Sequence, residues 1–263
     1  MRFTKYHGLG NDFIFLEDFE GLLLPQGEFL AQKLCHRNFG IGADGLVLIV
    51  KDAGLYTMRI FNADGTEAEM CGNAIRCMAD YLLQEGLVSG QLLHIGSLGG
   101  TKEVRVEEGT YIVDMGEPDF STDLGEKITV LSQEHPWTIY PVSMGNPHGV
   151  VFVEDLADLD FEFWGPRLES DPIWPNKANI EFAQVLSSNH LKVMVWERGA
   201  GPTLACGTGA CAATVVAIKQ GLVTGPTRVS LPGGDLSIEW GPNNRVYMSG
   251  PATKVFTGDI KLK

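Results

Sequence analysis

The feature that most constrains the fold of this 263-residue chain is an internal repeat. When the sequence is shifted by 135 positions, residues 71–88 (CGNAIRCMADYLLQEGLV) align without a gap on residues 206–223 (CGTGACAATVVAIKQGLV), and five of the 18 positions are identical. Average residue usage would give about one identity by chance. Similarity at one fixed spacing is typical of a duplicated structure.

Further matches at nearly the same spacing extend the repeat into both halves of the chain. They pair Gly10-Asn11 with Gly145-Asn146, 57–62 with 192–197 and, after a one-residue adjustment, 98–100 with 232–234. The copies then cover about 1–115 and 136–250, joined by a polar, turn-rich connector. We predict two domains, residues 1–115 and 116–250, and a last strand in residues 251–263 that could return to the first domain's sheet.

Strand-like segments dominate both copies. Short runs rich in β-branched and aromatic residues, separated by glycine and proline, predict strands, and two helices are expected in each copy. One predicted helix covers 27–38, and another follows each Cys-Gly loop. The one at 210–219 is apolar on nearly all sides, so it is expected to be buried. The predicted fold class is α+β: two pseudo-symmetric duplicated domains, each a curved, mostly antiparallel sheet around a buried helix.

Charge and cysteine content narrow the class of function. The chain has 20 Lys and Arg against 33 Asp and Glu, a formal net charge of -13, which disfavours nucleic acid or an anionic membrane as a partner. No apolar run reaches 18 residues and no secretory pattern opens the chain, so neither a membrane span nor a secretory signal is expected. The spacing of the five cysteines fits neither a disulfide scaffold nor a zinc site, which predicts free thiols in a reducing cytoplasm and no metal.

One glycine-rich segment matches a dinucleotide-binding motif in the wrong context. GIGADG at 40–45 has the pattern G-x-G-x-x-G. A dinucleotide site needs a strand before this loop and a helix after it, so that the pyrophosphate meets the helix N-terminus. Here the predicted helix precedes the loop and a strand follows it. We therefore reject dinucleotide binding and predict a tight turn.

Two Cys-Gly pairs, Cys71-Gly72 and Cys206-Gly207, stand at equivalent points of the two copies. Each follows a strand and a polar loop and directly precedes a predicted helix. The amides of a helix N-terminus favour a thiolate and can bind a carboxylate, so we predict a lowered pKa for both thiols. Either cysteine alone could be a small buried hydrophobe, but the duplicated placement favours a functional pair. A structural role is predicted for the other three, Cys35, Cys77 and Cys211.

Two matched thiols could invert a stereocentre. A thiolate on one side of a substrate removes a proton, and a thiol on the other side delivers a proton to the opposite face. The helix N-termini would hold the substrate carboxylate and spread the charge of the forming carbanion. This chemistry requires no cofactor, and the sequence contains no evident motif for one.

Four segments together resemble the diaminopimelate epimerase family: HGLGNDF (7–13), FNADGTEAEMCGNAIRC (61–77), MGNPH (144–148) and WERGAGPTLACGTGACA (196–212). The resemblance covers essentially the whole chain. It implies a cofactor-independent, two-base epimerase that converts LL- to meso-diaminopimelate in lysine and peptidoglycan biosynthesis, with its active site in an interdomain cleft. It also implies a cytoplasmic protein with a small amino-acid substrate. The oligomeric state stays open, with a homodimer as one alternative.

The resemblance assigns a role to each matching residue. It makes Cys71 and Cys206 the catalytic acid–base pair. The residues implied to contact the reacting carboxylate are Gly72, Asn73, Gly207 and Thr208, and those implied to bind other polar groups of the substrate are Asn11, Asn62, Asn146, Asn179, Glu197 and Arg198. His148 and Glu197 are implied to tune the thiols. The chain departs from the family at Gly45, where some members carry a substrate-contacting Gln.

Each of these residues also has a simpler interpretation. An Asn after a glycine commonly serves only a turn, Asn62 could cap its own loop, and Glu197-Arg198 could be a solvated ion pair. Equivalent placement in the two copies favours binding roles. The alternative functions are a proline or hydroxyproline racemase, an isomerase of the phenazine-biosynthesis type, and a non-catalytic amino-acid-binding protein. The cysteine pair and the Asn and Glu-Arg set favour diaminopimelate epimerisation.

Overall fold

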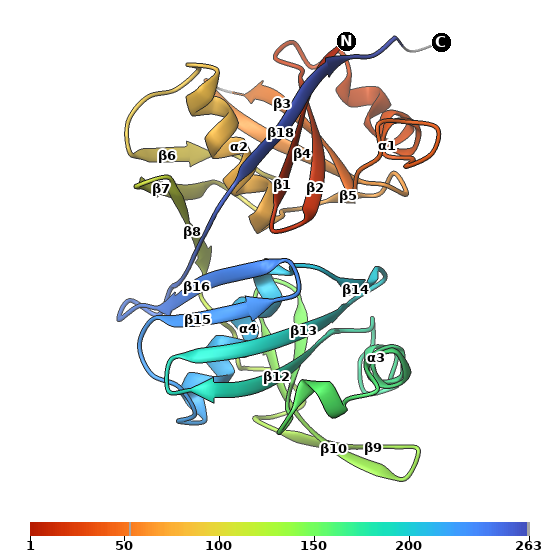
Figure 1. Cartoon of the computed structure of the whole chain (residues 1–263), viewed down its shortest axis with the longest axis vertical. Coiled ribbons are helices and arrows are strands. Elements are labelled where there is room, and N and C mark those ends of the chain that lie inside the picture. Colours follow the sequence, from red (N-terminus) through yellow and green to blue (C-terminus); the bar gives the residue numbers. More distant parts are fainter. Residues whose placement is uncertain (53, 262–263) are drawn as a thin grey trace. The chain divides into compact units, whose positions relative to one another are not determined.

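A computed structural model describes residues 1–52 and 54–261, and the chain divides into two compact units. Unit 1 contains Met1–Val113 and Gly250–Lys263, and unit 2 contains Asp114–Ser249 (Figure 1). The sequence analysis placed these divisions at 115/116 and 250/251. The C-terminal segment therefore belongs to the same unit as the N-terminus.

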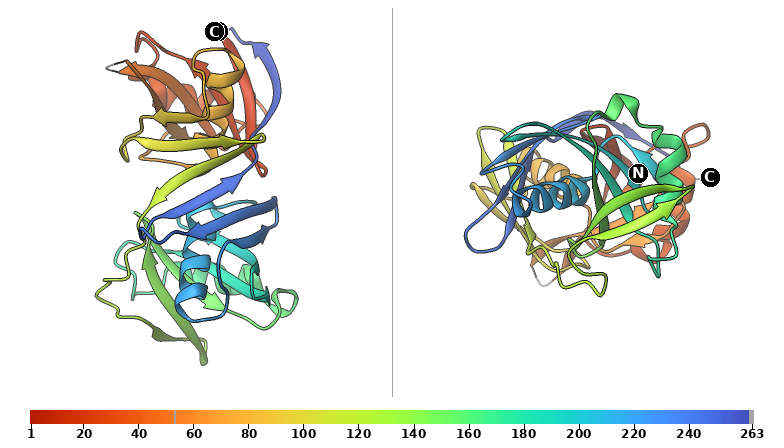
Figure 2. Two further views of the ribbon diagram at one scale, coloured as in Figure 1. Left: turned by 90° about the vertical axis from the view of Figure 1, so that its left-hand side faces the viewer. Right: turned by 90° about the horizontal axis from the view of Figure 1, so that it is seen from below.

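Unit 1 is built on a six-stranded sheet in the order β18-β1-β2-β3-β4-β5. Its strands are β1 (Arg2–Gly8), β2 (Asn11–Glu17), β3 (Gly45–Asp52), β4 (Leu55–Asn62), β5 (Glu67–Ala68) and β18 (Thr253–Asp259). The chain's last strand, β18, runs antiparallel beside β1, in dark blue in Figures 1 and 2. Three more strands pair in chain order: β6 (Leu92–Ile95), β7 (Lys102–Glu107) and β8 (Thr110–Gly116). The helices are η1 (Leu24–Gln26), α1 (Gly27–Leu34) and α2 (Gly72–Gln84).

Unit 2 contains the corresponding elements. Its strands follow the order β17-β16-β15-β13-β12-β11-β10-β9, with β14 added on β13. They are β9 (Ile128–Ser132), β10 (His135–Ser143), β11 (Pro147–Phe152), β12 (Asn179–Ser187), β13 (His190–Glu197), β14 (Gly201–Thr203), β15 (Thr227–Leu231), β16 (Gly234–Trp240) and β17 (Val246–Gly250). Its helices are η2 (Leu156–Asp158), α3 (Phe161–Glu169) and α4 (Gly207–Lys219).

The pairing of the strands repeats between the units. In unit 1, β1–β2 is antiparallel, β2–β3 is parallel, and β3–β4 and β4–β5 are antiparallel. The same series joins β10 to β14 in unit 2. Each series leads into a helix, α2 or α4, that begins directly after a cysteine. The predicted α+β fold of two duplicated halves is confirmed.

The helix that follows each cysteine is buried. Ten of the 13 residues of α4 are buried, as its apolar sequence predicted, because an apolar helix on a surface would leave its area in water. Helix α2 also buries polar groups, and these have partners: Asp80 accepts hydrogen bonds from the hydroxyls of Tyr6 and Tyr111. Within the described chain, no helix has the length and apolar content that a membrane crossing needs.

The other helix of each unit covers the core of the corresponding sheet. In unit 1, Leu30 and Leu34 of α1 pack in one cluster with Leu46 and Leu48 of β3. The equivalent cluster of unit 2 joins α3 to β12 through Phe161, Leu168, Ile180 and Phe182. Alternate residues of a strand point to opposite faces. Val47, between Leu46 and Leu48, therefore points away from α1, and Glu181, between Ile180 and Phe182, points away from α3.

Helix α1 ends four residues earlier than the sequence predicted. The prediction extended it to Asn38, but the structure ends it at Leu34. The chain then folds back, and the amides of Ile41 and Gly42 donate to the Leu34 carbonyl at 2.8 and 3.0 Å. Gly40 permits this approach, since a Cβ there would lie 2.4 Å from the Lys33 carbonyl oxygen.

Part of the predicted connector is a strand. Residues Ile128–Ser132 form β9, which pairs antiparallel with β10. The sequence analysis missed it because β9 is a short strand at the edge of its sheet, and its apolar residue Leu131 is exposed. Strands β1, β5 and β14 were also not predicted.

The pairing of β18 with β1 predicts that unit 1 depends on the C-terminus. Removing residues 251–263 would take away the antiparallel partner of β1 and the ring contact of Phe256 with Phe3. We expect the free energy of unfolding, measured in urea by circular dichroism, to fall by about 3 kcal/mol or more. Equal urea midpoints for the shortened and complete chains would contradict this structural role.

Candidate active site

Cys71 and Cys206 occupy the same position in their respective units. Each is the N-cap residue of the following helix, with extended backbone geometry. Their carbonyls accept helical hydrogen bonds from Ile75 at 2.9 Å and Ala210 at 3.0 Å. The first amides of each helix therefore point out of the helix end beside a thiol, where an anion can bind.

Asn11 links Cys71 to the first hairpin of unit 1. Gly10, with a φ of 88°, turns the chain from β1 into β2, which begins at Asn11. The Asn11 Oδ1 atom lies 3.8 Å from the Cys71 Sγ atom and accepts a hydrogen bond of 3.1 Å from Asn73 Nδ2. The buried Arg76 donates to Asn73 Oδ1 at 3.0 Å. Asn11, Cys71 and Asn73, all predicted as site residues from the sequence, thus lie together.

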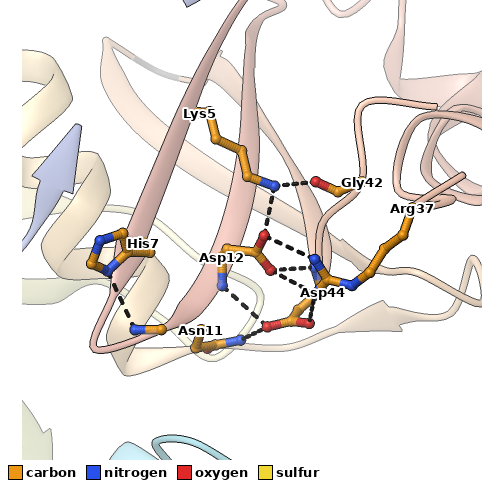
Figure 3. Close-up of polar contacts among 8 residues, drawn as sticks. Lys5, His7, Asn11, Asp12, Arg37, Gly42 and Asp44 are labelled. Carbon is orange, nitrogen blue, oxygen red and sulfur yellow. Dashed lines mark hydrogen bonds and ion pairs between the residues drawn. The ribbon is translucent and has the colours of Figure 1, made fainter. Parts of the chain in front are cut away.

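Charged side chains hold Asn11 in place (Figure 3). Its Nδ2 atom donates to Asp44 Oδ2 at 2.9 Å. Asp12 and Asp44 cap each other, since the amide of each donates to the carboxylate of the other at 3.1 and 3.0 Å. Arg37 bridges the two carboxylates at 3.0 and 2.7 Å. Because Asn11 Nδ2 is directed toward Asp44, the Oδ1 atom is directed toward Cys71.

Lys5 adds a buried positive charge to this network. Its Nζ atom lies 2.7 Å from Asp12 Oδ2 and donates to the Gly42 carbonyl (Figure 3). Burial raises the pKa of the Asp12 carboxyl, but the hydrogen bonds from Arg37 and Lys5 outweigh burial and lower that pKa overall. The glycine loop 40–45 is thereby tied to β1 and β2. It lies between α1 and β3, in the order predicted, and supports Asn11.

Cys206 is buried among polar groups of unit 2. Its Sγ atom lies 3.5 Å from Thr208 Oγ1. Burial raises the pKa of the Cys206 thiol well above its ordinary value, and the carboxylates of Glu197 and Glu181 raise it further. Hydrogen bonds from Thr208 and from the backbone at Gly209 act in the opposite direction but are outweighed. The predicted lowering of this pKa is therefore wrong for Cys206.

A buried histidine–carboxylate pair lies in the same part of unit 2. His148 Nδ1 is 2.7 Å from Glu181 Oε1, and both side chains are fully buried. His148 Nε2 is 2.9 Å from Asn146 Oδ1, so the pair reaches the β10–β11 turn. Burial raises the pKa of the Glu181 carboxyl and of the nearby Glu197 carboxyl, whose contact with Cys206 acts in the opposite direction.

Asn179 joins two further segments of unit 2. Its Nδ2 atom donates to the Pro147 carbonyl at 2.9 Å, and its Oδ1 atom accepts from the Arg198 amide at 2.9 Å. The buried Glu169 fixes the next residue of that loop by accepting from the Gly199 amide at 2.9 Å. Asn179 therefore orients the loop that carries Glu197 and Arg198.

Gly45 occupies the position of unit 1 that corresponds to Asn179. Gly45 pairs with Phe13 across β2 and β3, and Asn179 pairs with His148, 135 residues after Phe13. A Cβ at Gly45 would lie 3.0 Å from the Phe61 carbonyl oxygen, so a side chain there requires a small shift. Unit 1 has no side chain at the position of Asn179.

Other predicted residues lie apart from these clusters. Asn62 Nδ2 donates to Thr66 Oγ1 at 3.0 Å within its own loop, which is the capping role that the sequence analysis kept as an alternative. The Arg198 side chain is exposed. Cys35, Cys77 and Cys211 are buried, and burial raises the pKa of both Cys35 and Cys77 to about 12, as expected for structural thiols.

The sequence did not predict the charged residues that support the site, namely Lys5, Asp12, Arg37, Asp44 and Glu181. Asp12 and Asp44 each lie in a glycine-containing motif, GNDF or GADG, and their place beside a tight turn was a usable signal. Glu181 had a weaker signal, because it is a single acid inside an otherwise mostly apolar strand. A strand interior that buries a carboxylate is unusual enough to indicate a partner.

Comparison with solved structures defines the fold class. The chain is similar to a phenazine biosynthesis protein of the PhzF family from Bacillus anthracis, with a TM-score of 0.73 and 17% identity over 100% of this chain and 99% of the other. It is also similar to a hydroxyproline epimerase from Agrobacterium vitis, with a TM-score of 0.69 and 11% identity over 98% of this chain and 91% of the other. At these identities the likeness concerns the fold alone.

Sequence comparison defines the family within that class. The profile of the family described as diaminopimelate epimerase matches residues 3–121 and 140–255. A diaminopimelate epimerase from Desulfitobacterium hafniense is 48% identical over 98% of this chain and 97% of its own length. Another from Pelotomaculum thermopropionicum is 47% identical over 100% of both chains. The chain belongs to the diaminopimelate epimerase family.

The lowered pKa of Asp12 predicts an acid-sensitive unit 1. A carboxyl with a depressed pKa in the folded chain contributes stability above its ordinary pKa of about 3.9 and loses it as the pH falls through the folded-state value. The free energy of unfolding should therefore decline between about pH 5 and pH 2, and less steeply for Asp12→Asn than for the wild type.

Urea unfolding across this pH range, followed by circular dichroism, measures both slopes. Asp123→Asn is the matched control, because it removes one exposed carboxylate from the segment between the copies and should keep the wild-type slope. An Asp12→Asn slope as steep as that of the wild type would contradict the stabilising role assigned to the network.

Proposed function

We propose that this protein catalyses the cofactor-independent, two-base epimerisation of LL-2,6-diaminopimelate to meso-diaminopimelate, in lysine and peptidoglycan biosynthesis. The observation that carries the proposal is the pair of thiols, Cys71 and Cys206, at equivalent helix N-termini of two duplicated units. Relatives named diaminopimelate epimerase match the chain over its whole length and support the choice of substrate.

The two thiols divide the proton transfers. One sulfur, as a thiolate, takes the Cα proton, so that an S–H bond forms while the Cα–H bond breaks and its electron pair stays on the substrate. The other sulfur, as a thiol, gives its proton to the opposite face of Cα. The roles exchange in the reverse reaction. No electron leaves the substrate, so the step requires no redox partner.

The helix N-termini lower the barrier to forming the carbanion. Backbone amides at Gly72 and Asn73, and at Gly207 and Thr208, are the proposed donors to the substrate carboxylate, onto which the charge spreads. Loss of one such donor costs about 3 kcal/mol of transition-state stabilisation in other enzymes. A pair of helix ends can therefore supply a large part of the catalysis without a cofactor.

The remaining polar residues are proposed to bind the substrate's other groups. The exposed guanidinium of Arg198 suits a carboxylate, and the Glu197 carboxylate suits an ammonium group. The side-chain amides proposed to complete the site are those of Asn11, Asn62, Asn146 and Asn179. His148 and Glu197 are proposed to tune the thiols, which agrees with the contact between Glu197 and Cys206.

We further propose a cytoplasmic location, because thiols stay reduced there and the chain has five free cysteines. A homodimer is the assembly proposed for test, and sedimentation velocity of the purified protein would give the mass. A small amino acid is the proposed partner, and the net charge of -13 disfavours nucleic acid.

Replacing either proposed catalytic thiol should abolish turnover. We expect Cys71→Ala and Cys206→Ala each to lower kcat by at least about 100-fold, since a general acid or base contributes roughly 10²–10⁴-fold. Conversion of the LL to the meso isomer, followed by chiral chromatography, measures this loss. Cys35→Ala is the control, because that thiol is buried beside α1 and should affect stability only. Near-normal turnover by Cys71→Ala would overturn the proposal.

A further inference from the structure

We propose that Glu181 is a positioning residue for this reaction: together with His148 it keeps the proton on Cys206, so that Cys206 begins the reaction as the acid. The proposal rests on the two-thiol function proposed above. It is carried by the geometry of a buried pair in unit 2, and its test measures the Cys206 thiol directly rather than turnover.

Glu181 is directed toward the start of α4. Its strand neighbours Ile180 and Phe182 pack in the core cluster with α3, so the Glu181 side chain points to the opposite face of β12. A Cβ at Gly209, in the first turn of α4, would lie 2.8 Å from Glu181 Oε1 and 3.3 Å from Cys206 Sγ. The absence of a side chain at Gly209 therefore gives the carboxylate its place beside Cys206.

His148 and Glu181 form a fully buried pair. His148 Nδ1 and Glu181 Oε1 are 2.7 Å apart, and both side chains have 0% exposure. His148 Nε2 lies 2.9 Å from Asn146 Oδ1, so both ring nitrogens of His148 have a polar partner. Glu181 Oε2 has no hydrogen-bond partner among the residues that the structure describes. Glu181 Oε1, the oxygen that pairs with His148, is also the one nearest to Gly209.

The duplicated unit shows that the fold does not need this pair. Strand pairing makes Val47 of β3 the counterpart of Glu181, because the partners of the two residues are 135 positions apart. These partners are Phe15 and Ile60 for Val47, and Val150 and Val195 for Glu181. At the same spacing, Phe13 corresponds to His148 and Ala74 to Gly209.

All three counterparts in unit 1 are buried apolar residues, namely Phe13, Val47 and Ala74. The three corresponding positions of unit 1 therefore pack well without a charged side chain. A buried ion pair is commonly no more stable than apolar residues of similar volume, because both charges lose their water. Stability does not account for the His148–Glu181 pair, and its proximity to Cys206 gives it a role that Val47 and Phe13 cannot fill.

Two carboxylates act on Cys206, those of Glu197 on β13 and Glu181 on β12. His148 on β11 pairs with Glu181. Of the buried pair, Glu181 is the member that places a carboxylate beside Gly209 and Cys206. A negative charge at this distance opposes formation of a second one on the sulfur, so the proton stays on Cys206.

The test is the pH dependence of Cys206 alkylation in Glu181→Gln. Iodoacetamide modification of the Cys206 peptide, followed by mass spectrometry across pH 6–11, gives the midpoint of thiol ionisation. Removing the carboxylate charge should move this midpoint down by about one pH unit, since one charge a few ångströms away acts with more than about 1 kcal/mol. Asp235→Asn is the matched control: it removes a carboxylate of unit 2 that pairs with Arg228 and should leave the midpoint unchanged.

A purely structural role for Glu181 gives a different result. Looser packing would raise the alkylation rate at every pH without moving the midpoint, and this outcome would overturn the proposal. If Glu181→Gln fails to fold, the double variant H148F/E181V, which copies Phe13 and Val47, provides the same test and should also lower the midpoint. If Cys206→Ala retained turnover, the proposed function would fall while the alkylation result could still stand.

Discussion

Burial of the two helices that follow the cysteines fixes the helix ends around which each unit is built. Helix α4 is apolar on nearly all sides, and the buried Asp80 and Arg76 of α2 are hydrogen-bonded, so each helix is enclosed by its own unit. A buried helix presents its first amides at one defined place. In both units the residue at that place is a cysteine, and the adjoining hairpin supplies an Asn, Asn11 or Asn146.

The chemistry of Cys206 is decided by competition between the helix end and burial. A helix N-terminus typically favours an adjacent anion by about 0.3–1 kcal/mol, and by up to about 2 kcal/mol in partly buried sites. Burial of an ionisable group can shift a pKa by as much as about 3–5 units, which is several kcal/mol. Burial and two carboxylates therefore prevail, and the pKa of Cys206 is raised. The helix end is then better suited to the substrate's carboxylate than to a resting thiolate.

Most of the fold could be predicted from the sequence, because a duplication leaves matched motifs and because β3, β4, β12 and β13 are long apolar runs. The edge strand β9 could not be predicted, because a half-exposed strand has little apolar pattern. The end of α1 was missed because it depends on a fold-back of residues 40–42 onto Leu34. The cysteines and asparagines could be found from motifs, whereas Glu181 depends on a contact with a residue 33 positions away, which no local pattern specifies.

If two different groups remove and deliver the Cα proton, the first product formed in heavy water must carry solvent hydrogen. LL-diaminopimelate would be incubated with the wild-type protein in deuterium oxide, and both isomers analysed by mass spectrometry while conversion is still low. With one thiol on each face of Cα, the meso product carries one deuterium at the inverted centre while unreacted LL substrate remains unlabelled. A meso product that retained the original hydrogen would show that a single group returns the proton it removed, and would contradict the two-thiol account.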